Sequence, residues 1–298
     1  MKKLTSIICL LVTAIIVNAQ QTDVPKLSGS YLGQKPPGLT PEIFAPGIIS
    51  TDKHEFSCCF SPNGNEFYFT RMNPDERQNY IIWTGLIDGM WTKPEIAPFG
   101  GPFTFEPFIT PDNQMVYFQT GKVKDGQLLM YTMYADRTEQ GWSEVKDPGE
   151  IFNPMKTMHI SCTKNGTIYT TDISGGMGTE ALGIIRKENG EYKKLEKLAS
   201  LLNNEKLSQH PWIAPDESYL IFTVRRPGQQ PESALFCSFR DIDGNWSEPK
   251  EIKLNISNPG QPFITYDGKY LFFTSIKNRQ GDIYWVSAEI IGKLRPKD

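Results

Sequence analysis

Phe60-Ser61-Pro62-Asn63-Gly64-Asn65-Glu66-Phe67-Tyr68-Phe69-Thr70 joins a turn to a run of aromatic residues. Proline presets φ, asparagine bonds to its own backbone and glycine tolerates positive φ, so Pro-Asn-Gly favours a tight hairpin. The aromatic run after the turn is typical of a strand that is buried on both faces. This segment therefore predicts two antiparallel strands and the turn between them.

The same pattern recurs at a spacing of about fifty residues, which indicates a repeat protein. The five turns cover residues 60–64, 109–113, 162–166, 213–217 and 264–268. Each turn is followed by an aromatic or β-branched strand and then by a third strand. A glycine just before an aromatic residue, as in Gly89-Met90-Trp91, comes next in four of the units. Four strands per unit make the blade of a propeller, so we expect an all-β, five-bladed β-propeller of four-stranded antiparallel blades.

The fifth unit ends early, at Gly292-Lys293-Leu294, where the other units continue into an outer strand. Residues 40–46, Thr-Pro-Glu-Ile-Phe-Ala-Pro, match residues 93–98, Lys-Pro-Glu-Ile-Ala-Pro, in the outer strand of the first unit. An open ring would leave sheet edges unpaired and prone to aggregation. We therefore expect the N-terminal strand to close the last blade. The recurring Trp91, Trp142 and Trp246 are expected to pack the blades.

The N-terminus has the charged, apolar and small-residue zones of a secretory signal. We divide the chain into a signal peptide (1–19), an N-terminal extension (20–38) and the propeller (39–298). The apolar run, residues 7–17, is shorter than the roughly 20 residues that span a bilayer. We expect an exported protein, periplasmic or secreted, with no membrane span, and a monomer. The net charge of −3 gives no basic surface for nucleic acid.

The Pro-Asn/Asp-Gly turn followed by an aromatic-rich strand resembles the TolB-type propeller repeat, a relative of the WD repeat, over residues 54–288. That family includes a periplasmic protein that binds partner proteins of the Tol system. It also includes propeller modules of prolyl-oligopeptidase-like peptidases and oligogalacturonate lyases that hold a metal on histidines. This sequence departs from the repeat at Lys164 and Tyr266, where the other turns have proline. It lacks a Gly-x-Ser-x-Gly motif, which argues against the peptidase.

In each of the five units, the residue five positions before the proline position of the turn is polar. These residues are Ser57, Glu106, His159, His210 and Gln261. Functional residues of propellers usually lie at the mouth of the central channel, where the innermost strands begin. Equivalent positions in a closed ring face a common axis, so we expect these five side chains, called here the ring residues, to converge.

Two functional hypotheses follow from the ring residues. The first is an exported propeller without catalytic activity that binds a glycan or protein ligand at the channel mouth, through Ser57, Glu55, Glu106 and Gln261. Polar residues in a water-filled channel are also expected for solvation alone. The absence of a complete catalytic set favours binding, since fold alone does not define an activity. Glycoside hydrolysis ranks lower, because it needs two carboxylates and the ring has only Glu106.

The second hypothesis is a metal-assisted carbohydrate-active enzyme. Glu106, His159 and His210 resemble a 2-His-1-carboxylate set, with Gln261 as a fourth ligand, and would suit a divalent ion such as Mn, Zn or Fe.

The reaction expected of such an enzyme is the lyase cleavage of acidic oligosaccharides. Arg71 or Arg225 would neutralise a uronate carboxylate while a histidine abstracts the α-proton. His54, near the same mouth, is a candidate for that base.

Overall fold

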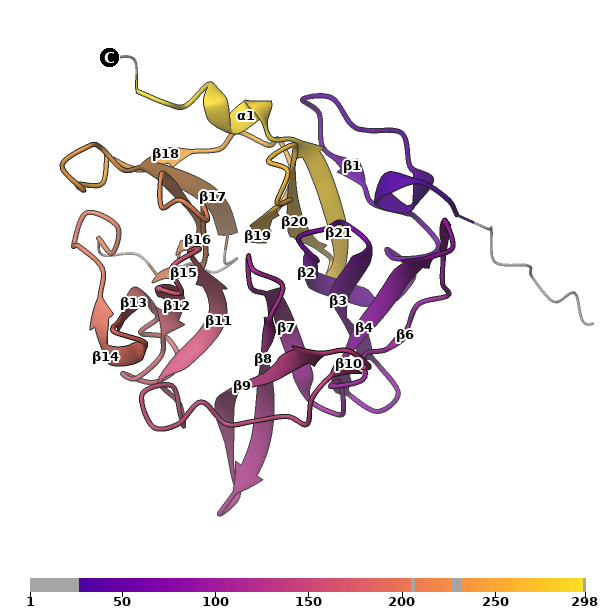
Figure 1. Ribbon diagram of the computed structural model, residues 1–298. Helices are drawn as coiled ribbons and strands as arrows, with labels where there is room; N and C mark the ends of the chain where they lie inside the picture. Colours follow the sequence, from indigo (N-terminus) through magenta and orange to yellow (C-terminus); the bar gives the residue numbers. More distant parts are fainter. Residues whose placement is uncertain (1–26, 205–206, 227–231, 297–298) are drawn as a thin grey trace, which may run out of the picture.

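The computed structural model describes residues 27–204, 207–226 and 232–296. These residues form five antiparallel sheets around a central axis (Figure 1), which confirms the predicted five-bladed β-propeller. In this part of the chain, none of the helices has the length and apolar composition needed to cross a membrane. The predicted signal peptide lies outside the described residues.

Each blade begins with an inner strand, and the inner strands of neighbouring blades contact one another around the axis. Blade 1 consists of β2 (His54–Phe60), β3 (Glu66–Asn73), β4 (Gln78–Ile87) and an interrupted outer strand, β5 (Met90–Trp91) and β6 (Glu95–Ile96). Blade 2 consists of β7 (Thr104–Ile109), β8 (Met115–Lys124), β9 (Gln127–Thr138) and β10 (Gly141–Trp142). Blade 3 consists of β11 (Thr157–Cys162), β12 (Ile168–Asp172), β13 (Ala181–Glu188) and β14 (Glu191–Lys197).

Blade 4 consists of β15 (Leu207–Ile213), β16 (Tyr219–Arg226), β17 (Glu232–Phe239) and β18 (Lys250–Glu251). Blade 5 consists of β19 (Pro259–Ile264), β20 (Tyr270–Lys277), β21 (Gln280–Ser287) and β1 (Glu42–Ile43). Two short helical turns, η1 (Ser30–Gly33) and α1 (Glu289–Gly292), complete the described residues. The hairpin of β8 and β9 projects beyond the ring (Figure 1).

The turn between the first and second strands is the same in every blade. Its last residue has a left-handed backbone, with φ between +58° and +85°, in Gly64, Asn113, Gly166, Glu217 and Gly268. The preceding side chain closes the turn: Asn63 Oδ1 accepts a bond from the N–H of Asn65 (3.1 Å). The sequence pattern Pro-Asn-Gly therefore forms the tight hairpin that it predicts.

The N-terminal strand closes the last blade, as predicted. β1 pairs antiparallel with β21, with Glu42 opposite Trp285 and Ile43 opposite Tyr284. Phe44, the next residue, is fully buried. It packs edge-on against aromatic rings of blades 1 and 5, namely Phe60, Phe67, Phe272 and Trp285. The side chain that follows β1 therefore joins the first blade to the last.

The described part of the predicted N-terminal extension, residues 27–38, packs on blades 1 and 5. The carbonyl of Gly29 accepts a hydrogen bond from Trp91 Nε1 (2.7 Å), and the Tyr31 hydroxyl donates to Asp267 (2.8 Å). Leu32 is buried in the main core. These twelve positions therefore contribute to the same folded unit as the propeller.

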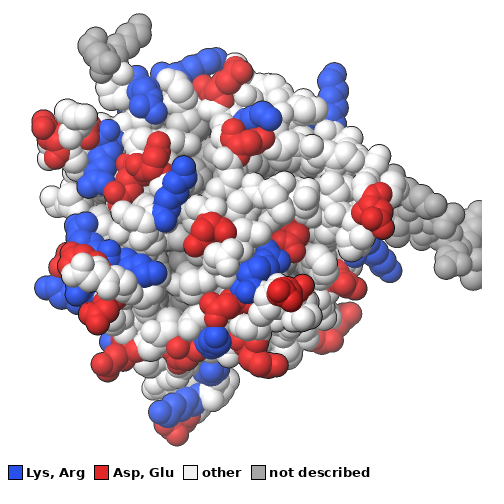
Figure 2. Space-filling model, viewed as in Figure 1, with Lys and Arg blue, Asp and Glu red and all other residues white. Residues whose placement is uncertain are grey.

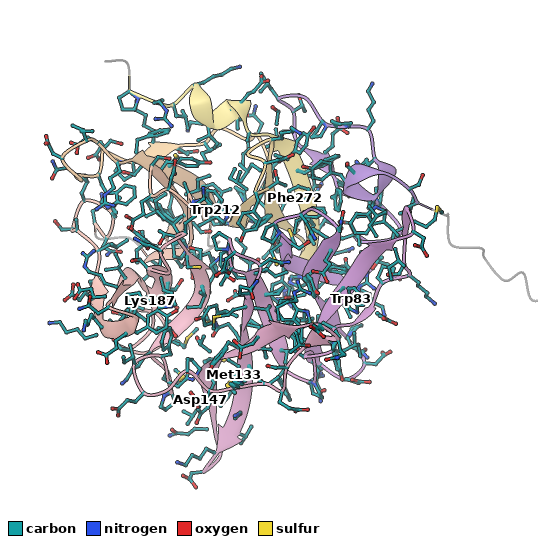
Figure 3. All side chains as sticks on the ribbon, in the orientation of Figure 1. Trp83, Met133, Asp147, Lys187, Trp212 and Phe272 are labelled. Carbon is teal, nitrogen blue, oxygen red and sulfur yellow. The ribbon has the colours of Figure 1, made fainter. Side chains whose placement is uncertain are left out.

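The recurring tryptophans pack within and between blades, as predicted. Trp91 is buried in the main core, and Trp142 of blade 2 donates a hydrogen bond to the Tyr68 hydroxyl of blade 1 (3.0 Å). Trp246 of blade 4 lies edge-on against Tyr169 of blade 3. Figure 3 shows side chains filling the space between sheets, and its labelled Trp212 and Phe272 belong to the main core.

Replacing Phe44 by alanine tests the closure of the ring. We expect Phe44→Ala to lower the free energy of unfolding by about 3–5 kcal/mol, because it empties a site between blades 1 and 5. Ile43→Ala is the matched control, since Ile43 is 36 % exposed and its loss should change stability by only about 0.5 kcal/mol. Urea unfolding measures both, and an equal effect of the two substitutions would contradict the closure role.

Candidate functional site

The five ring residues occupy the same backbone position in the five inner strands. Each has a left-handed backbone, with φ between 44° and 56°. Each also lies where the register between the first and second strands shifts. Such a β-bulge re-aims a side chain, and positive φ is uncommon for residues other than glycine. The bulge is therefore the local feature of the repeat that presents these side chains.

A threonine of the preceding blade holds four of the five bulges. The backbone N–H of Glu106 donates to Thr70 Oγ1 (2.9 Å). The same bond joins Ser57 to Thr274, His210 to Thr171 and Gln261 to Thr223, at 2.9, 2.9 and 3.1 Å. Blade 2 has Gln119 at the threonine position. These bonds fix each bulge against its neighbouring blade, and with it the direction of the ring side chain.

Three ring side chains meet around the carboxylate of Glu106. Gln261 Nε2 donates to Glu106 Oε1 (3.1 Å), and His210 Nε2 lies 3.5 Å from the same oxygen. His159 Nδ1 lies 3.9 Å from the other oxygen, Oε2. The two imidazoles stand edge to face with their centroids 5.2 Å apart. The structure thus brings together residues from blades 2, 3, 4 and 5, a group called here the Glu106 cluster.

Burial and neighbouring charges set the ionisation of this cluster. Burial raises the pKa of Glu106, but the hydrogen bond from His210, the charges of both imidazoles and the bond from Gln261 outweigh it, so that this pKa lies below its usual value. Burial lowers the pKa of His159 to about 4, against the opposing effect of Glu106. At neutral pH the cluster therefore holds an ionised carboxylate beside a neutral His159.

Two contacts cross the central axis from blade 5 to blade 2, which are not neighbours in the ring. The first is the bond between Gln261 and Glu106. The second lies at the other end of the inner strands, where the Tyr266 hydroxyl donates to the carbonyl of Ile109. Tyr266 is one of the two residues that depart from the Pro-Asp-Gly pattern, and this contact gives that departure a structural reason. The centre of the propeller is therefore bridged at two levels.

A cavity of about 420 Å³ opens beside the Glu106 cluster, between blades 3, 4 and 5. His210 and Gln261 belong both to its wall and to the cluster. The wall also includes the polar side chains of Glu180, Gln209, Arg225 and Glu232. At its edge the apolar side chains of Met177 and Ile276 are 58 % and 39 % exposed. The volume lies within the range of roughly 300–1,000 Å³ typical of small-ligand sites.

Buried polar atoms without a hydrogen-bond partner concentrate at this end of the channel. They are Glu106 Oε2, Gln119 Nε2, His159 Nδ1, His210 Nδ1 and Glu180 Oε2. In the rest of the described chain such atoms occur only in Trp83, Arg137 and Trp285. Buried polar groups normally have partners, and each unpaired one costs about 1–3 kcal/mol. A polar occupant at the channel would supply the missing partners.

Glu55 and Arg71, predicted as site residues, bond to each other and to the N-terminal segment. Glu55 is fully buried, and its Oε1 lies 2.7 Å from Arg71 Nε. The carboxylate also accepts bonds from the hydroxyl and N–H of Thr51, and Arg71 Nη2 donates to the carbonyls of Ile48 and Ile49. With these partners both residues hold the segment that follows β1, residues 48–51. We therefore do not include them in the candidate ligand site.

His54, Ser57 and Arg225 have three different surroundings. His54 Nδ1 lies 3.2 Å from the carbonyl of Arg279, and its ring lies beside Phe56, so it packs on the β20–β21 hairpin. Ser57 is buried, and its backbone N–H donates to Thr274 Oγ1. Arg225 is exposed and lines the cavity. Of the three, Arg225 is the residue placed to meet a ligand.

The metal hypothesis does not fit the arrangement of the ligands. Across the described ranges, no group of three or more His, Cys, Asp or Glu side chains is arranged to hold a metal ion. His210 Nε2 and His159 Nδ1 lie beside different oxygens of Glu106, at 3.5 and 3.9 Å. No step of the proposed function is therefore assigned to a metal.

Sequence reasoning missed Gln119 and Glu180. Gln119 could have been found, because it replaces the threonine at the equivalent position of the second strand in the other four blades. Glu180 follows the glycine-rich segment between β12 and β13. This loop is not part of the repeat, so the alignment of the five units does not predict where Glu180 lies. Its contribution to the cavity depends on the path of that loop.

Comparisons with known proteins identify the fold. The sequence matches no family model and no curated protein. TolB from Acinetobacter baumannii is similar in structure, with a TM-score of 0.52 and 15 % identity over 81 % of this chain and 54 % of TolB, so the chain spans about half of that structure. An endo-arabinase from Bacteroides thetaiotaomicron has a TM-score of 0.53 and 13 % identity, over 80 % of this chain and 95 % of the enzyme.

An α-L-arabinofuranosidase from Lactobacillus brevis has a TM-score of 0.48 and 14 % identity, over 79 % of this chain and 90 % of the enzyme. At such identities the likeness shows the β-propeller fold alone, since one fold supports many functions. The comparisons therefore do not establish the TolB-type repeat as the family of this chain.

The buried His159 predicts a dependence of stability on pH. The unfolded chain protonates this histidine near pH 6.5, whereas its pKa in the folded protein is about 4. Between these values the unfolded state binds the additional proton, so stability falls as the pH is lowered through this window, by about 3 kcal/mol in all. Glu106 acts in the same direction, since its lowered pKa also makes acid favour unfolding.

Urea unfolding across this pH window, on the wild type and on His159→Gln, measures the effect. The variant should lose less stability on acidification than the wild type. Identical pH profiles would show that His159 is not held neutral.

Arg71→Ala tests the structural role of the Glu55–Arg71 pair. Removing the guanidinium leaves Glu55 buried without its charged partner, and we expect a loss of about 3–5 kcal/mol. Arg225→Ala, at an exposed position, should change stability by only about 0.5 kcal/mol. Equilibrium unfolding checks both values. If Arg71→Ala were as stable as the wild type, Arg71 would again be a candidate for ligand binding.

Proposed function

We propose that this protein is a ligand-binding propeller that holds a short segment of a glycan in the cavity beside the Glu106 cluster. The observation that carries the proposal is the concentration of unpartnered buried polar atoms at this end of the channel. Of the residues with unpartnered atoms, Glu180 and His210 line the cavity. A ligand rich in hydroxyl groups both donates and accepts hydrogen bonds, so it can satisfy a carboxylate and an imidazole together.

The shape of the site favours a glycan over a protein surface as ligand. The cavity is concave, whereas protein partners are usually bound over broad areas. Its wall offers the amide of Gln209, and its edge offers Met177 and Ile276 to the C–H faces of a sugar. Figure 2 shows acidic and basic side chains interspersed over the visible face, without an extended area of one sign.

Two further considerations are compatible with this function. The leader predicts export, which would expose the cavity to glycans outside the cytoplasm. The endo-arabinase is a carbohydrate-active enzyme on a similar fold, although the likeness itself extends only to the fold.

Binding is better supported than the lyase chemistry. A lyase needs a cation for the uronate carboxylate and a base for the α-proton. Arg71 is engaged by Glu55, and His54 packs on the β20–β21 hairpin. Of such a set, Arg225 and the ring histidine His210 line the cavity.

Filling the cavity tests the proposal. A Cβ on Gly260 would contact Thr223 at an ordinary distance of 3.6 Å, and both residues line the cavity. Gly260→Leu should therefore fold and occupy the space of the ligand. Gly292→Leu is the matched control, because Gly292 lies in α1 with open space around it.

Isothermal titration of the mature protein with neutral, acidic and amino oligosaccharides measures binding. We expect at least one of these classes to bind, and Gly260→Leu to weaken that binding by more than about tenfold, or 1.4 kcal/mol, while the control binds like the wild type. Absence of binding across the panel, or full binding by Gly260→Leu, would overturn the proposal. Cleavage of a uronate with new ultraviolet absorbance would support the lyase instead.

A further inference from the structure

We infer that the cavity recognises a protonated amino group on its ligand. This inference rests on the proposed function and adds the chemical class of the ligand. It follows from the charges around the cavity and from the type of atom that lacks a partner there.

Carboxylates outnumber cations around the site. Glu180 and Glu232 line the cavity, and Glu106 lies behind His210 and Gln261. Among the described residues of the wall, Arg225 is the single lysine or arginine, and it is exposed. A negatively charged site favours a cationic ligand group and disfavours an anionic one.

Glu180 is the carboxylate of the cavity wall that has a buried oxygen without a partner. Its side chain is 4 % exposed, and Oε1 accepts a hydrogen bond from the N–H of Gly178 (3.1 Å). Oε2 is buried with no partner. An ionised carboxylate accepts bonds and donates none, whereas an ammonium group donates three and accepts none. An amino group of the ligand is therefore the direct complement of the unpaired oxygen.

Acidic ligands fit this charge distribution less well. A uronate or phosphate would face the carboxylates of Glu180 and Glu232 with only Arg225 to oppose them. Arg71, the second cation expected at the mouth, is bound to Glu55. This charge distribution favours a cationic ligand group over the acidic oligosaccharides expected of a lyase.

Matched probes that differ only in acetylation test the inference. Chitosan oligosaccharides carry free amino groups, and chitin oligosaccharides of equal length carry the same nitrogens acetylated and neutral. A short peptide with a free N-terminus and its acetylated form provide the second source of the same chemistry. Titration calorimetry on the full mature protein measures the four affinities at a pH where the amines are protonated.

We expect an amine probe to bind at least about tenfold more tightly than its acetylated match. Glu180→Gln should abolish this preference, because it replaces the carboxylate by a neutral group of the same shape. Glu191→Gln is the control, since Glu191 lies on the same blade with its side chain 81 % exposed. The preference should also shrink with added salt, as expected for an ionic contact.

The outcomes separate this inference from the proposed function. Preference for one amine source identifies an amino sugar or a peptide amine, and both support the inference. Equal binding of amine and acetylated probes, still abolished by Gly260→Leu, would overturn the inference and leave the glycan site standing. A preference that persists in Glu180→Gln, or one that requires a divalent metal, would also overturn the inference. So would the failure of every amine probe to bind.

Discussion

The left-handed bulge in each inner strand is the constraint on which the site depends. Without it, the period-2 alternation of a strand would continue past the ring residue and change which side chains face the axis. The threonine of the preceding blade holds four of the five bulges. Strain at these positions is therefore balanced by contacts between blades, and the same contacts set the positions of Glu106, His210 and Gln261.

Ring closure and the site meet in blade 5. This blade is incomplete without β1, and it supplies both side chains that cross the axis, Gln261 and Tyr266. The buried Glu55–Arg71 pair strengthens the same closure by holding carbonyls of the segment after β1. Loss of the N-terminal strand would consequently disturb the Glu106 cluster as well as the fold.

The fold could be predicted because its signals are local. Pro-Asn-Gly and the aromatic run after it determine a hairpin within eleven residues, and repetition of that hairpin determines the architecture. Convergence of Glu106, His159, His210 and Gln261 followed from register alone. The partners of Glu55, Arg71 and His54 could not be predicted, because they come from the N-terminal segment and the β20–β21 hairpin. Glu180 could not be predicted, because its place depends on a loop outside the repeat.

The central claim is that the unpaired atoms of Glu106, Gln119 and the two imidazoles are completed by a polar occupant. A crystal structure of the mature protein at atomic resolution, determined without added ligand and then with a bound oligosaccharide, tests this most directly. We expect ordered water within hydrogen-bonding distance of Glu106 Oε2 in the first structure and ligand atoms in the cavity in the second. A dry channel in which these side chains rotate to bond one another would contradict the account.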